Sequence, residues 1–60
     1  MKITAFLHSA NFNITIQDLD TNKVLILEDD QDSISIFFDE FKQIKDLTEA
    51  IETTLKEMEQ

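Results

Sequence analysis

The spacing of apolar residues changes once along the chain, and this change limits the fold more than any other feature. Apolar and polar residues alternate in short runs up to residue 38, which is typical of strands with one polar face. Ser, Asn and Asp separate the runs and favour turns. The sequence therefore predicts four strands in an antiparallel meander, at residues 2–8, 11–17, 23–28 and 33–38.

The chain after residue 38 has the spacing of an amphipathic helix, predicted at about 40–58. Asp39 is placed to cap the start of the helix, and Glu40 lies in its first turn. The apolar stripe, which we expect to cover one sheet face, contains Phe41, Ile44, Leu47, Thr48, Ile51, Leu55 and Met58. The predicted fold class is α+β, a single domain over 1–60 with the order ββββα.

The run at 23–27 is apolar on both of its faces, so one of its two sets of side chains must lie away from the helix. We expect Val24 and Ile26 to face the helix. The opposite sheet face is then expected to hold four large apolar residues, Phe6, Leu25, Leu27 and Phe37. A contiguous patch of this kind usually marks an interface, which predicts a dimer or docking face. The alternative is that these side chains are partly buried by the chain itself or scattered singly.

The small size of the chain also favours a second copy. A domain of 60 residues buries only about 60% of the surface that its unfolded chain exposes. Domains of this size usually add disulfides, a structural metal or oligomerisation. The chain has no Cys and a single His, His8, which excludes disulfides and a histidine-rich metal cage. We therefore expect a homodimer, with a heteromeric subunit as the alternative.

The charge of the chain points to a basic partner. Thirteen Asp and Glu residues stand against five Lys and no Arg, which gives a net charge of −8. This balance disfavours direct nucleic-acid binding and anionic membranes. It favours a basic protein surface, and for a small protein that is most often the surface of a nucleic-acid-handling protein. The alternative is that the charge only keeps the protein soluble.

Acidic residues gather in two predicted turns. The first candidate partner-binding set is Glu28, Asp29, Asp30 and Asp32, and the second, at the opposite end of the sheet, is Asp18 and Asp20. Residues 18–22 match the start of a calcium loop, D-x-D-x-N, but Lys23 stands where such a loop needs Gly. We therefore expect no metal site and no cofactor at either turn.

No catalytic motif is found, and we expect a protein that is not an enzyme. His8 and Ser9 are neighbours in the chain, but neighbours on a strand point to opposite faces. No apolar run approaches the length of about 20 residues that spans a membrane. Met1, Lys2 and Ile3 open a strand-like pattern without the apolar core of a signal peptide, which predicts a cytoplasmic protein.

Residues 33–51, SISIFFDEFKQIKDLTEAI, resemble the last strand and helix of the PC4-like transcription cofactors. That resemblance implies a dimeric ββββα protein that binds single-stranded DNA or RNA, with Phe6 and Phe37 as stacking surfaces. The predicted strands supply Lys2 and Lys23 as basic residues, fewer than such binding requires.

The whole chain is similar in size, charge and composition to the small acidic inhibitors encoded by phages, including anti-CRISPR proteins. This similarity implies a non-enzymatic inhibitor that imitates DNA and occupies a basic surface of a host or defence protein, in the host cytoplasm if phage-encoded. An inhibitor of this kind would account for the excess of acids, the absence of Arg and the apolar sheet face that the helix does not cover. The alternatives are the PC4-like binder and a small regulatory subunit that docks by its apolar sheet face.

Overall fold

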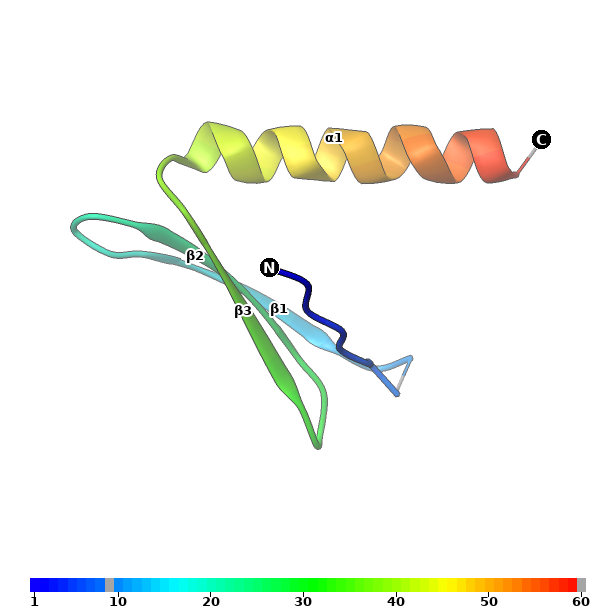
Figure 1. Cartoon of the computed structure of the whole chain (residues 1–60), viewed down its shortest axis with the longest axis horizontal. Coiled ribbons are helices and arrows are strands. Elements are labelled where there is room, and N and C mark those ends of the chain that lie inside the picture. Colours follow the sequence, from blue (N-terminus) through cyan, green and yellow to red (C-terminus); the bar gives the residue numbers. More distant parts are fainter. Residues whose placement is uncertain (9, 60) are drawn as a thin grey trace.

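The computed structural model describes residues 1–8 and 10–59 and contains a three-stranded sheet followed by one helix (Figure 1). Adjacent strands pair antiparallel in the order β1-β2-β3. The elements are β1 (Asn13–Asp18), β2 (Lys23–Glu28), β3 (Ser33–Phe38) and α1 (Phe41–Met58). The prediction of four strands is therefore wrong, and the described fold is βββα.

The missing strand is the one predicted at residues 2–8, which lies beside β3 without joining the sheet. A hydrogen bond from the His8 backbone N–H to the Asp29 side-chain Oδ2, at 3.2 Å, ties this segment to the β2-β3 hairpin. Ile3 and Phe6 both remain exposed in this segment. Alternation of apolar and polar residues shows that a segment is suited to a half-buried strand. It does not show that another part of the protein is available to cover its apolar face. The predicted turn at 9–11 includes Ser9, which lies outside the described residues.

The other elements match their predicted ranges closely. β2 and β3 occupy the predicted residues, and β1 begins at Asn13, two residues later than expected. The N-cap of α1 is Glu40, not Asp39. Gln43 Oε1 accepts hydrogen bonds from the backbone N–H groups of Asp39 and Glu40, at 2.8 and 2.9 Å. The Gln43 side chain, at the third position of α1, thus provides an acceptor for two backbone N–H groups that precede the helix.

Both hairpins close with four-residue loops of the same type. The Leu19 N–H donates to the Asn22 carbonyl, and the Asp29 N–H donates to the Asp32 carbonyl, both at 2.9 Å. No residue in the described ranges has a positive φ angle. Loops of four residues are most often built around a type I turn, which needs no left-handed residue. This explains how a chain without Gly makes its turns.

The register of the sheet decides which face of each strand meets the helix. Leu25 pairs with Ile16 and Ile36, and Leu27 pairs with Ile14 and Ile34. These two rows lie on the helix side of the sheet, since the space between sheet and helix is lined by residues of both rows. Because neighbouring residues of a strand point to opposite faces, Val24 and Ile26 face away from the helix. The prediction that Val24 and Ile26 face it is wrong.

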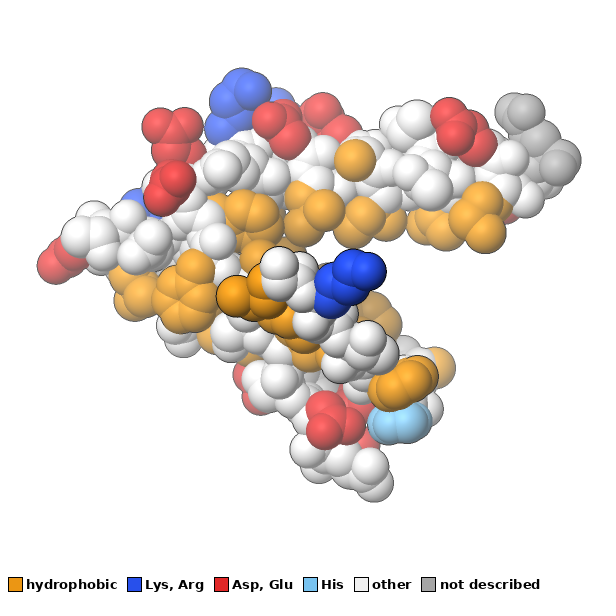
Figure 2. All heavy atoms as spheres, in the orientation of Figure 1, with side chains coloured by type: hydrophobic (Ala, Val, Ile, Leu, Met, Phe, Trp, Pro, Cys, Tyr) orange, Lys and Arg blue, Asp and Glu red, His pale blue; other side chains and the backbone are white. Residues whose placement is uncertain are grey.

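The core of the single chain is small. Among the described residues only Val24 and Ile44 are buried apolar side chains, with 3% and 6% of their surface exposed. The axis of α1 diverges from the sheet after its first turns, so the two layers form an open wedge (Figure 1). Apolar side chains line the side of α1 that faces the sheet, and most charged side chains of the helix lie on the other side (Figure 2).

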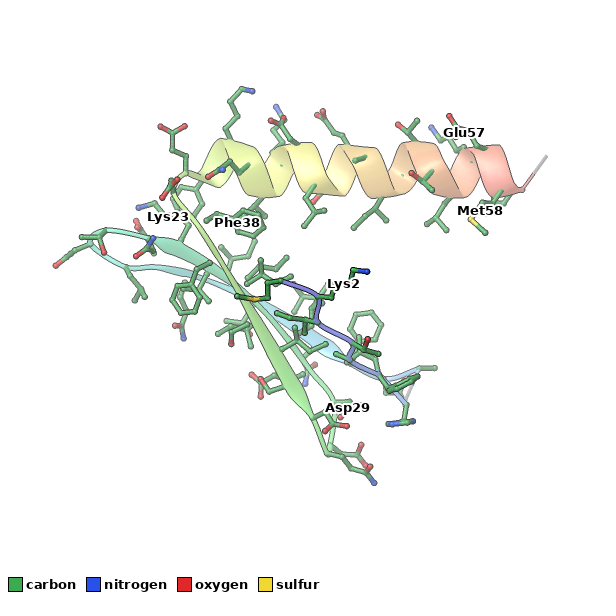
Figure 3. All side chains as sticks on the ribbon, in the orientation of Figure 1. Lys2, Lys23, Asp29, Phe38, Glu57 and Met58 are labelled. Carbon is green, nitrogen blue, oxygen red and sulfur yellow. The ribbon has the colours of Figure 1, made fainter. Side chains whose placement is uncertain are left out.

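Lys23 holds the closed end of the wedge. Its Nζ lies 2.6 Å from Asp18 Oδ1, 3.4 Å from the Leu19 carbonyl and 5.2 Å from the centre of the Phe41 ring. Figure 3 shows Lys23 and Phe38 together below the start of the helix. A cation above an aromatic ring is attracted by the negative face of the ring. Lys23 therefore joins the first hairpin to the first turn of α1.

Candidate protein-binding surfaces

The β2-β3 hairpin presents the larger acidic cluster at its tip. Glu28 ends β2, and the loop that follows contributes Asp29, Asp30 and Asp32. The side chains of Glu28, Asp30 and Asp32 are exposed. Their backbone is fixed by the loop hydrogen bond between Asp29 and Asp32. We call these three carboxylates, Glu28, Asp30 and Asp32, the acidic tip.

Asp29 has a different environment from its neighbours. Its Oδ1 accepts hydrogen bonds from the backbone N–H groups of Asp32 at 2.6 Å and Gln31 at 2.8 Å, and its Oδ2 accepts from His8. These bonds favour the charged carboxylate and lower the pKa of Asp29 below its usual value, with those of Asp32 and Gln31 contributing most. The carboxylate is therefore engaged in shaping the turn, and its role in partner binding stays a prediction.

The second acidic pair lies at the other end of the sheet. In the register Asp18 stands opposite Lys23, which pairs in turn with Phe38, next to the start of the helix. The ion pair with Lys23 occupies Asp18, whereas Asp20 is exposed in the β1-β2 loop. The two acidic turns are therefore separated by the length of a six-residue strand, about 20 Å.

The acidic loops and the lone helix carry no sign of a metal site or a membrane span. Across residues 1–8 and 10–59, no three His, Cys, Asp or Glu side chains are grouped so as to hold a metal ion. Residues 18–22, which match the start of a calcium loop, form the end of a strand and a hairpin loop. In the same part of the chain, no helix combines the length and the apolar character needed to cross a bilayer.

The four residues predicted as a dimer or docking face do not share a face. Leu25 and Leu27 lie on the helix side of the sheet, while Phe37 pairs with Val24 on the opposite side. Phe6 lies outside the sheet, where its ring stacks on that of His8 with centres 5.7 Å apart. Phe6 and Phe37 are both exposed. A docking role for these residues stays a prediction, but the sheet does not gather them into one patch.

An apolar groove between α1 and the sheet is the surface that sequence reasoning missed. It measures about 440 Å³, has Ile16, Leu25 and Ile36 on one wall, and has Ile44, Leu47 and Ile51 on the other. One signal could have indicated it. An 18-residue helix is about 27 Å long, whereas a six-residue strand is about 20 Å long. The apolar stripe of α1 is therefore longer than the sheet it was expected to cover.

Three comparisons bear on the identity of the chain. Comparison with protein-family models, with curated proteins and with solved structures finds no match in any of the three.

Proposed function

We propose that the protein is a non-enzymatic inhibitor that binds a basic surface of a nucleic-acid-handling protein in the cytoplasm and imitates the charge of DNA. A host or phage-defence protein is the partner class that we favour. The proposal rests on the acidic tip, in which three exposed carboxylates lie within five residues at the end of a hairpin. A concentrated negative field of this kind attracts a basic surface and speeds the encounter with it.

The positions of the Lys residues support this proposal. Lys23 is paired with Asp18 at the other end of the sheet, and Lys42 is paired with Asp46 on the helix at 3.2 Å. Lys2 lies well away from Asp29 in Figure 3. Lys45 and Lys56 belong to α1, which lies on the opposite side of the molecule from the tip (Figure 1). The negative charge of the acidic tip is therefore not offset by a neighbouring Lys.

A variant that neutralises the acidic tip tests the proposal. With Glu28→Gln, Asp30→Asn and Asp32→Asn combined, we expect binding to weaken by about tenfold, since each exposed ion pair contributes up to about 1 kcal/mol. The measurement is capture from a nuclease-treated cell extract on the immobilised wild type and variant, followed by titration of the captured protein. Wild-type binding should also weaken steeply as salt rises, because exposed charges drive it.

A matched control changes three acids outside the tip. Glu49→Gln, Glu57→Gln and Glu59→Gln combined remove the same charge from the helical end of the chain. This control should bind like the wild type. Equal weakening of both variants, or wild-type binding that does not respond to salt, would show that the acidic tip is not the binding surface.

The groove favours a second candidate function, a small regulatory subunit that docks by its apolar face. Leu25 lies on the wall of the groove. In that case Leu25→Asp would abolish the complex, because it places a charge in an apolar contact. The tip variant would then bind like the wild type. The two candidates therefore give opposite patterns in the same capture assay.

We do not propose the PC4-like function. The resemblance implied a four-stranded sheet, and the described residues form three strands. Phe6, one of the two expected stacking residues, lines a shallow hollow together with Asp32, whose carboxylate repels phosphate. In a filter-binding assay at low salt, we expect the protein to retain no single-stranded DNA.

A further inference from the structure

The single chain exposes more surface than a compact protein of its mass. Its accessible surface is 5362 Å² for 7.0 kDa, whereas a compact monomer of this mass exposes about 4,000 Å². The surplus of about 1,300 Å² exceeds the roughly 800 Å² that each partner contributes to a standard protein–protein interface. The chain therefore carries enough uncovered surface for one stable interface.

Part of the uncovered apolar surface belongs to the second half of α1. Ile51, Leu55 and Met58 are 51%, 52% and 76% exposed, although all three lie on the apolar stripe. Met58 points to the open side of the wedge, and Glu57 points away from it (Figure 3). A helix half without tertiary contacts is marginal in water, because packing of its apolar face supplies most of its stability. This half of the helix needs a cover that its own sheet does not supply.

We infer that a second copy of this chain fills the groove, with the second half of each α1 lying between the helix and sheet of the other copy. The groove is an apolar site that lacks an occupant, and the residues Ile51, Leu55 and Met58 form an apolar stripe that lacks a cover. Insertion of the apolar stripe of one copy into the groove of the other would fill the groove and cover the stripe. A two-fold axis repeats that contact, so both copies are closed and no groove remains.

The charge distribution fits a second copy better than a charged partner. Among the residues that line the groove, Glu52 is the only one with a charged side chain. Charges buried there without partners would be costly. Apart from Glu52, most acids of a second copy lie in its loops and on the far side of its helix, where they would stay in water (Figure 2). The acidic tip is also outside the groove, so this inference does not depend on the proposed function.

The oligomeric state of the purified full chain tests the inference. We expect sedimentation equilibrium to give twice the chain mass of 7.0 kDa at micromolar concentration, and a melting temperature that rises with protein concentration. Leu55→Glu should weaken the dimer by at least about 100-fold, because it buries a charge in the apolar contact. Leu55 is half-exposed in the single chain, so this variant should disturb the contacts within a monomer far less than a change at the buried Ile44 would.

Thr53→Glu is the matched control, since it adds the same charge on the side of the helix away from the groove. It should remain a dimer. A wild type that is monomeric at all concentrations and melts cooperatively would overturn the inference, as would a dimer that Leu55→Glu leaves intact. These measurements need no partner protein, so their failure is distinguishable from failure of the acidic tip to bind one.

Discussion

At the scale of single residues, Asp29 shows that neighbouring acids in one turn have separate tasks. Asp29 accepts three backbone hydrogen bonds, including one from His8, which lies 21 residues away in the chain. Asp30 is exposed, and no described residue donates a hydrogen bond to its side chain. Asp29 therefore stabilises the turn, while the acids around it are the ones that we propose a partner recognises.

Asp29→Ala should lower the melting temperature at neutral pH, because it removes the acceptor for these backbone donors. The pKa of Asp29 is lowered in the folded state. The contribution of Asp29 to stability is therefore fully present above the pKa that this residue has in the unfolded chain. It is lost as the pH falls through the folded-state pKa. The difference between wild type and variant should therefore shrink in acid, which thermal melts across a pH series will show.

Asp30→Ala is the control for that pH series. It removes a carboxylate from the same loop without removing a hydrogen bond to the described residues. Its melting temperature should equal or slightly exceed that of the wild type, since one source of repulsion between acids is gone. An equal loss of stability in both variants would mean that Asp29 does not hold the turn.

At the scale of elements, the weakest junction is the one between α1 and the sheet. Ile44 is the one helical side chain described as buried, and Lys23 above the Phe41 ring holds the first turn beside it. Beyond this point the helix has no close support from its own sheet (Figure 1). The junction therefore sets the angle of the wedge and the width of the groove.

Ile44→Val should cost about 0.5–1.5 kcal/mol of unfolding free energy and Ile44→Ala about 2–5 kcal/mol, because a cavity opens in a core of very few residues. Urea denaturation measures both values. Lys45→Ala, which changes an exposed neighbour, should have little effect. Similar losses for all three variants would mean that helix formation alone, and not the contact at Ile44, limits stability.

The sequence predicted the elements better than their faces. β3 and α1 were predictable from alternation and from a helical stripe, and β2 from a short apolar run between two turn segments. Which face of β2 meets the helix was not predictable, since residues 24–27 are apolar on both sides. Only the four-residue loops fix the pairing of Leu25 with Ile16. Residues 2–8 also alternate, yet no cover for a strand exists there. The acidic tip was predicted, but the backbone bonds of Asp29 were not visible in the pattern.

At the scale of the whole molecule, the net charge opposes folding, although it would favour the basic partner that we propose. A charge of −8 on 60 residues is self-repulsive, and a dimer brings two such charges together. Most acids lie at the ends of the sheet and on the far side of the helix, and Glu52 alone is described as lining the groove (Figure 2). This placement limits the repulsion at the contact that we infer between copies.

Salt should therefore act in opposite directions on stability and on partner binding. Raising NaCl from about 0.01 M to about 0.3 M screens the repulsion and should raise the melting temperature by about 5 °C, corresponding to about 1 kcal/mol. The tip variant Glu28→Gln/Asp30→Asn/Asp32→Asn carries less charge, so its shift should be smaller. Calorimetry at several salt concentrations measures both, and a melting temperature that falls with salt would contradict the prediction.

The two hairpin loops have one more consequence, for how this chain can evolve. Because no described residue needs a positive φ angle, no loop position is reserved for Gly. Asp30 and Gln31 can then be replaced by almost any amino acid without strain in the backbone, provided that Asp29 remains. If the surface of a partner changes, single substitutions in the acidic tip can therefore alter its charge and shape while the backbone of the hairpin stays the same.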